Sequence, residues 1–139
     1  MEQPYETEAP EAAKRCAVSI EAVELVRASE VIDLHLESFI PPRLWGYRLS
    51  ERHDHHWLGG RGFGHLDFPR ALDGGLTGAM WSIATNIARS ASGRWRALRS
   101  NVEALRQELL SYPGITVVRT SAEFRAARER GEHAAMISV

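Results

Sequence analysis

The sequence has one cysteine, one lysine and no long hydrophobic run. Because Cys16 stands alone, neither an intrachain disulfide nor a zinc site built from cysteines can form. No stretch reaches the roughly 20 apolar residues that a membrane-spanning helix needs. The acidic segment 1–14 lacks the apolar core of a secretory signal peptide. These absences predict a soluble protein without a membrane span, with the cytoplasm as its expected location.

An excess of charge of either sign is also missing. The chain has 17 basic and 18 acidic side chains, for a net charge of -1, and 44% of its 139 residues are hydrophobic. A chain so close to neutrality has no overall attraction for nucleic acid or for an anionic membrane, so we expect neither partner. Its length fits a single domain.

Common nucleotide-binding and hydrolase motifs are absent. There is no G-x-G-x-x-G between a strand and a helix, no Walker loop and no G-x-S-x-G. The glycine-rich segment 59–64 does not join a strand directly to a helix, so we assign it no phosphate-binding role.

The most informative feature that is present is the alternation of polar and apolar residues over 31–37. In a β-strand it would place Asp33, His35 and Glu37 on one face. The opposite face would present the apolar residues to a core, namely Ile32, Leu34 and Leu36. Imidazole and carboxylate groups are ligands of hard and borderline metals. The polar face of this segment is therefore either the solvent-exposed face of a half-buried strand or part of a metal site.

Hydrophobic periodicity predicts helices that alternate with strands. In chain order we expect a helix over 12–28 interrupted near Ser19, strands over 31–37 and 77–85, a long helix that ends before 112–114, a short extended piece at 115–118, a helix over 120–130 and a strand that starts at 134. This alternation favours an α/β fold with a parallel sheet. The nearly continuous apolar run of 77–85 is typical of a strand buried on both faces.

The two last helices carry clear local signals. Thr120 and Glu123 form a capping box, and Gly131 ends that helix. On the long helix, residues spaced three and four apart form one face that we expect to pack: Trp95, Leu98, Val102, Leu105 and Leu109. We expect the arginines of the same helix to be solvated, namely Arg94, Arg96, Arg99 and Arg106.

A long irregular segment, 38–76, separates the first two predicted strands and contains four histidines. The run His-Asp-His-His at 53–56 is either a second metal site or a solvated turn. We favour the turn, because adjacent loop residues seldom converge on one ion. We expect His65 and Asp67 to hold the loop by hydrogen bonds.

Three parts of the chain resemble the membrane (renal) dipeptidase family of metal-dependent amidohydrolases. Asp-Leu-His-Leu-Glu at 33–37 resembles the metal motif of its first strand. His-Leu-Asp-Phe-Pro-Arg at 65–70, with the glycine pair and the Trp-Ser pair that follow, is similar to its His-x-Asp-x-Pro-Arg segment, Gly-Gly turn and second strand. Val-Arg-Thr-Ser-Ala-Glu-Phe at 118–124 follows a long helix and precedes a helix and a strand, as in the family. The resemblance spans roughly 31–139.

This resemblance implies a TIM-type (β/α) barrel with two zinc ions that hydrolyses dipeptides or related amides. It implies that His35 and Glu37 bind one zinc ion at the carboxyl end of the first strand, where such barrels keep their active sites. Asp33 would support the end of the strand instead of binding the metal. The chain would then divide into an N-terminal tail and helix over 1–29 and a partial dipeptidase-like barrel domain over 30–139.

The chain departs from the family in two ways. Glu37 stands where aspartate is usual, and 139 residues compare with about 250 for a TIM barrel. The family's metal-bridging glutamate and two later histidines have no counterpart here. We therefore expect an incomplete barrel, an incomplete zinc site, no catalytic residue in this chain and no activity from the chain alone.

Three alternatives follow from this incompleteness. The chain would be one half of a split enzyme, with a partner chain or a homo-oligomer supplying the rest. It would otherwise be a non-catalytic interaction module. The third alternative is a metal-binding protein that uses the loop histidines.

Overall fold

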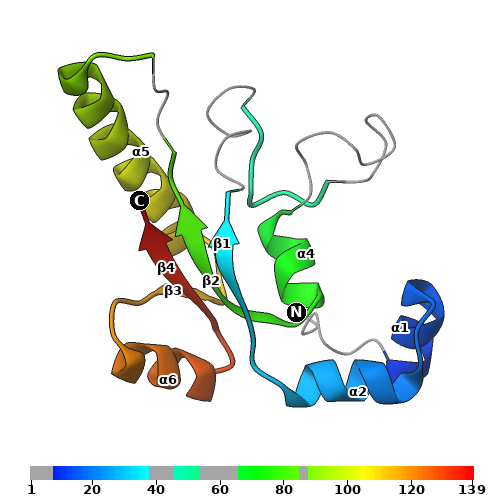
Figure 1. Ribbon diagram of the computed structural model, residues 1–139. Helices are drawn as coiled ribbons and strands as arrows, with labels where there is room; N and C mark the ends of the chain where they lie inside the picture. Colours follow the sequence, from blue (N-terminus) through cyan, green and yellow to red (C-terminus); the bar gives the residue numbers. More distant parts are fainter. Residues whose placement is uncertain (1–7, 38–45, 54–65, 85–87) are drawn as a thin grey trace.

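The computed structural model describes residues 8–37, 46–53, 66–84 and 88–139. The chain forms an α/β fold in which helices alternate with the strands of one sheet (Figure 1). The elements are α1 (Ala9–Cys16), α2 (Ile20–Ala28), β1 (Val31–Leu36), α4 (Phe68–Asp73), β2 (Leu76–Ser82), α5 (Ala91–Ser111), β3 (Ile115–Val117), α6 (Ser121–Glu129) and β4 (His133–Ser138). The predicted α/β class with a parallel sheet is confirmed.

The four strands are parallel and lie in the order β1-β2-β4-β3. β2 pairs with β4 over its last five residues, from Gly78 opposite Ala134 to Ser82 opposite Ser138. The predicted burial of this strand on both faces is confirmed, since five of its seven residues are buried. All four strands run in the same direction, so their carboxyl ends meet at one edge of the sheet (Figure 1).

β1 is an edge strand, and its apolar face is less covered than the alternation predicted. Leu36 is buried, but Leu34 is 69% exposed and Ile32 is 38% exposed. The prediction that all three side chains rest on a core was therefore wrong for the first two. The reason lies in the pairing: among the described strands β1 pairs with β2 alone, and its register with β2 shifts twice along its six residues.

The main core lies on the face of the sheet that α4 and α5 cover. Leu105 and Leu109 of α5 are fully buried there, as are Phe68 of α4 and Trp81 of β2. The rings of Phe68 and Trp81 meet edge to face with their centroids 5.4 Å apart, a favoured arrangement of aromatic pairs.

Trp95 lies outside this core, although its spacing placed it on the same helical face. Its side chain is 60% exposed, whereas Leu98 and Val102 are half-buried. The prediction that Trp95 packs was therefore wrong. Periodicity identifies the face of a helix, but it does not tell how far along that helix the neighbouring sheet extends.

A smaller cluster lies on the other face, where α6 packs on β4. It joins Ala127 of α6 to Val118 and Ala134, with Phe124 packed against them. The predicted capping box starts this helix: the Thr120 hydroxyl accepts a hydrogen bond from the Glu123 amide, and the Glu123 carboxylate accepts one from the Thr120 amide.

α1 and α2 form a separate pair beside the sheet (Figure 1). Ala17 lies between them in the left-handed conformation, and Ser19 caps α2, so the predicted interruption near Ser19 is confirmed. None of the helices in the described ranges has both the length and the apolar character that crossing a bilayer requires.

Candidate metal centre at the carboxyl edge of the sheet

β1 brings His35 to the carboxyl edge of the sheet. Leu36 stands opposite Trp81 of β2, and Trp81 in turn stands opposite Ile137 of β4. The residues that end the three strands therefore lie at the same level. Since the carboxyl edge is where open parallel sheets and barrels bind their ligands, it is the place to examine for chemistry.

The structure brings His35 and Glu37 together there. The His35 Nε2 atom lies 3.6 Å from the Glu37 Oε1 atom, and the two side chains are 73% and 47% exposed. The Ser82 hydroxyl lies 3.5 Å from the His35 Nδ1 atom. The predicted strand and the predicted proximity of these two side chains are confirmed.

The spacing of this pair fits two ligands of one zinc ion. Zinc binds histidine nitrogen at about 2.0–2.1 Å and carboxylate oxygen at about 2.0–2.2 Å, so two ligands of one tetrahedral ion lie about 3.4 Å apart. The separation of 3.6 Å is within a few tenths of an ångström of that value. One nitrogen and one oxygen ligand are a donor set that zinc accepts.

The pair supplies two ligands and no more within the described ranges. No group of three His, Cys, Asp or Glu side chains arranged to hold a metal occurs in that part of the chain. Asp33 is the nearest candidate in the sequence, but its Oδ1 atom accepts a hydrogen bond of 2.8 Å from the His35 amide. Asp33 thus steadies the backbone at His35, the supporting role that was predicted for it.

A second polar cluster surrounds Asp67, whose side chain is completely buried. Its carboxylate accepts hydrogen bonds from the amides of His53 and Arg70 at 2.8 Å and from the Arg70 Nε atom at 2.7 Å. Asp67 is the N-cap of α4, so one carboxylate starts that helix and ties the segment around His53 to it. The predicted loop-holding role of Asp67 is confirmed.

Burial by itself would raise the pKa of Asp67. The two amide donors and the Arg70 guanidinium outweigh that effect and hold the pKa below its usual value. Tyr47 completes the cluster: its ring stacks on His53 with centroids 3.8 Å apart, and its hydroxyl accepts a hydrogen bond from Arg70. Sequence inspection had assigned no role to Tyr47, and no local pattern marks it.

The remaining candidates of the long loop lie outside the described residues. Of the run 53–56, the structure describes His53 alone, and His65 also falls outside. His53 contacts Asp67, with 3.5 Å between its Nδ1 atom and the Oδ2 atom. The His53 side chain is 30% exposed and its ring stacks on Tyr47. The choice between a turn and a metal site for the other histidines stays a prediction.

Comparisons with known proteins add no assignment. No family model matches the chain, and no curated protein matches it either.

Proposed function

We propose that this chain contributes to a zinc-dependent hydrolase site of the dipeptidase type, with a dipeptide or a small amide as substrate. His35 and Glu37 would be the zinc ligands of the first strand. One observation carries the proposal: an imidazole nitrogen and a carboxylate oxygen lie 3.6 Å apart at the carboxyl edge of a parallel sheet. In this proposal the sheet is the opening part of a (β/α) barrel, and β1, β2 and β4 are its first three strands.

Each residue of the pair has a definite task in this proposal. His35 would offer Nε2 to the metal, and its Nδ1 atom lies 3.5 Å from the Ser82 hydroxyl, where an outer contact could hold the ring of a metal-binding histidine. Glu37 adds a negative charge that offsets part of the charge of the ion. A bound zinc ion would polarise the scissile carbonyl and lower the pKa of a water molecule.

The proposal requires further ligands from outside the described residues or from a second chain. A catalytic zinc site normally has three protein ligands, whereas the described part of the edge offers two. We therefore expect zinc binding without appreciable hydrolysis by the isolated chain.

Zinc affinity tests the assignment of the ligands. We expect His35→Ala and Glu37→Gln each to weaken zinc binding at least about tenfold, measured by competition with a chromophoric chelator, as loss of a ligand should. Glu37→Asp, which restores the family's usual residue, should retain binding. Asp67→Asn would be an unsuitable control because Asp67 is buried. Glu51→Gln is a better one, since Glu51 is an exposed carboxylate in the ion pair with Arg48.

Two results would contradict the proposal or part of it. If the double variant of His35 and Glu37 still binds zinc, the metal site would be assigned to the loop histidines instead. Hydrolysis of a dipeptide panel by the pure chain with added zinc would overturn the expectation that the chain alone is inactive.

A non-catalytic interaction module is the second candidate. It is favoured by an apolar groove beside α5, whose lining includes the exposed ring of Trp95.

A further inference from the structure

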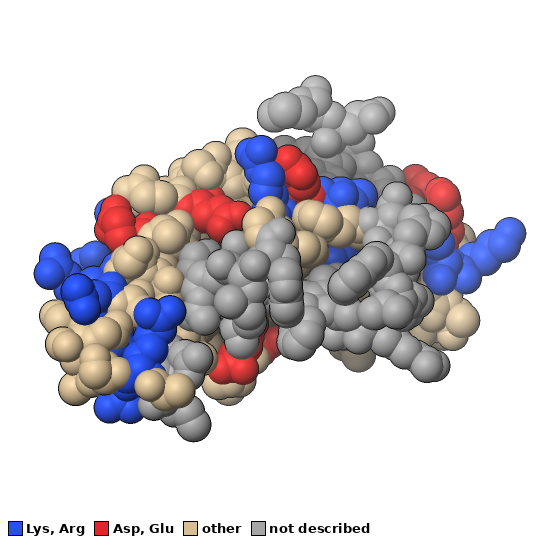
Figure 2. Space-filling model, turned by 90° about the horizontal axis from the view of Figure 1, so that it is seen from above, with Lys and Arg blue, Asp and Glu red and all other residues tan. Residues whose placement is uncertain are grey.

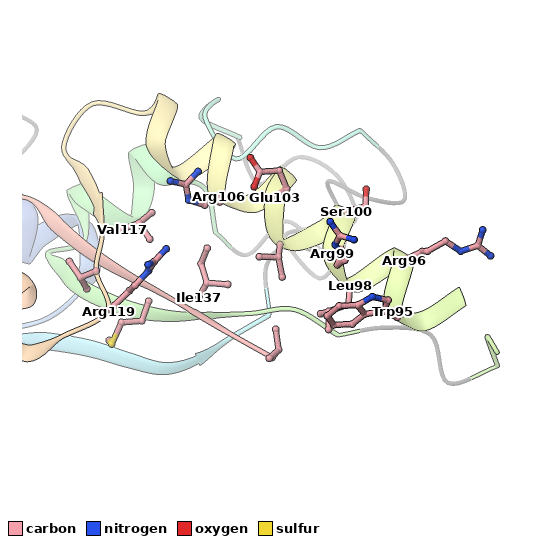
Figure 3. A pocket seen from close by; sticks show the side chains of 14 residues that line it. Trp95, Arg96, Leu98, Arg99, Ser100, Glu103, Arg106, Val117, Arg119 and Ile137 are labelled. Carbon is pink, nitrogen blue, oxygen red and sulfur yellow. The ribbon is translucent and has the colours of Figure 1, made fainter. Parts of the chain in front are cut away.

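The groove lies between α5 and the part of β4 that extends past the end of β3 (Figure 3). Its volume is about 1050 Å³. Trp95 and Leu98 lie at one end of it, and Val117 lies toward the other, with Ile137 between them (Figure 3). Its apolar residue Trp95 is strongly exposed, at 60%.

The groove exists because β3 is shorter than β4. β3 pairs with residues 133–135 of β4, and its last contact is the hydrogen bond from the Val118 amide to the Ala135 carbonyl. Alternate residues of a strand direct their backbone groups to the same side. Since His133 and Ala135 bond toward β3, the amide and carbonyl of Ile137 point to that side as well, past the end of β3.

Positive charge surrounds this open edge. Four arginines and one glutamate line the groove: Arg96, Arg99, Arg106, Arg119 and Glu103. Basic side chains gather at the end of the molecule that α5 occupies (Figure 2). Among the described residues, the ion pairs formed by arginine involve Arg48, Arg52, Arg70 and Arg130. Of the groove arginines, Arg119 lies close enough to Glu123 to help lower the pKa of that carboxylate, and its side chain is exposed.

From these three observations we infer that the groove binds an extended, acidic peptide segment of a partner protein. The segment would add to the sheet beside β4, with its backbone on the amide and carbonyl of Ile137. Alternate apolar side chains would contact Trp95, Leu98 and Val102, and carboxylates would meet the arginines. Strand addition of this kind uses main-chain hydrogen bonds for affinity and side-chain pockets for specificity. The inference does not depend on the zinc site.

The dimensions suit a short segment. From Trp95 to Arg106 the helix advances by eleven residues, or about 16 Å at about 1.5 Å per residue. An extended chain covers that length with about five residues at about 3.3 Å each.

A pair of capped five-residue peptides tests the inference on the full chain. The probe is fluorescein-labelled Glu-Val-Glu-Val-Glu, and its charge-reversed counterpart is Lys-Val-Lys-Val-Lys. We expect the acidic peptide to bind at least tenfold more tightly by fluorescence anisotropy. The binding should weaken as salt rises, because the arginines of the groove are near the surface.

Charge reversal on the protein localises the binding. Arg99→Glu together with Arg119→Glu should weaken binding of the acidic peptide at least tenfold, since both side chains are exposed in the groove. Arg94→Glu is the matched control, because Arg94 is exposed on the same helix but does not line the groove. It should change the affinity less than twofold. Thermal unfolding of each variant verifies that the fold is retained.

Three results would overturn the inference. The first is equal binding of the two peptides, and the second is equal loss of binding in Arg94→Glu and in the double variant. The third is displacement of the labelled acidic peptide by a single-stranded oligonucleotide at a lower concentration than the unlabelled acidic peptide requires. That result would identify the groove as a nucleic-acid site. Since none of these measurements involves zinc, failure here leaves the proposed hydrolase function untouched.

Discussion

His133 shows how a single histidine can be fixed in the neutral state by its surroundings. It is 2% exposed at the start of β4. Its Nδ1 atom lies 2.8 Å from the carbonyl oxygen of Leu76, which can only accept, so Nδ1 carries the hydrogen. Its Nε2 atom accepts a hydrogen bond of 3.2 Å from the Trp81 indole. A proton on Nε2 would therefore place two donors face to face.

The pH dependence of stability follows from this arrangement. Burial lowers the pKa of His133 below its ordinary value of 6.5, and the bond to Leu76 offsets this only in part. Below about pH 6.5, the unfolded chain therefore binds a proton at His133 that the folded chain does not bind. The contribution to stability is complete above about pH 6.5 and is lost as the pH falls toward the folded-state pKa, at up to about 1.4 kcal/mol per pH unit.

Between pH 7.5 and 5, the free energy of unfolding of His133→Gln should fall less steeply with decreasing pH than that of the wild type. The difference in slope should reach up to about 1.4 kcal/mol per pH unit, the value for one proton. Urea unfolding at a series of pH values measures it. His35→Gln is the control for the replacement of a histidine, because the His35 side chain is 73% exposed. Equal slopes in the wild type and in His133→Gln would show that His133 does not titrate on unfolding.

At the scale of elements, α6 lies so close to the sheet that a side chain at one strand position would be crowded. A Cβ atom on Gly78 of β2 would lie 2.9 Å from Phe124 Cε2 and 3.1 Å from the Ala134 carbonyl oxygen. The first neighbour is a side chain, but the second is backbone and is fixed by the pairing of β2 with β4. This close approach lets Phe124 cover the cluster that contains Ala134.

Gly78→Ala should therefore destabilise the fold by about 1–3 kcal/mol, the usual cost of overpacking. Phe124→Leu removes the nearer of the two contacts, so we expect the double variant to lose less than the sum of the single changes. A double-mutant cycle from urea unfolding measures this coupling. Strict additivity would contradict the proposed contact. The single variant Phe124→Leu is the reference for the loss of packing against the cluster that contains Ala134.

The elements also show which features a sequence can and cannot reveal. Most helices and strands follow from periodicity and caps, except α4, which lies within the segment 38–76 that was expected to be irregular. The proximity of His35 and Glu37 follows from the two-residue repeat of a strand. The environment of His133 does not, because its partners Trp81 and Leu76 lie 52 and 57 residues away. The exposure of Trp95 is equally hidden, since it depends on where β3 ends.

At the scale of the whole molecule, the N-terminal helices contribute little to the core. α2 has no buried residue, and α1 buries Ala13 alone. Apolar side chains of α2 and of the turn before it remain exposed: Val18, Ile20, Leu25 and Val26. Val26 approaches the segment before β2 at Gly75, where an added Cβ would lie 3.7 Å from one of its methyl groups. Opening of residues 9–28 would expose little apolar surface that solvent does not already reach.

We therefore expect α1 and α2 to open without unfolding of the sheet, in keeping with the predicted boundary near residue 29. Free energies of local opening fall well below the global value where few apolar contacts hold a segment. In native-state hydrogen exchange of the full chain, amides of α2 should be at least about 100-fold less protected than those of β2 and β4. α5 provides the helical control, because it buries Leu105 and Leu109 against the sheet. Its amides near those residues should match the strands, whereas equal protection of α2 would mean that the whole described chain unfolds as one unit.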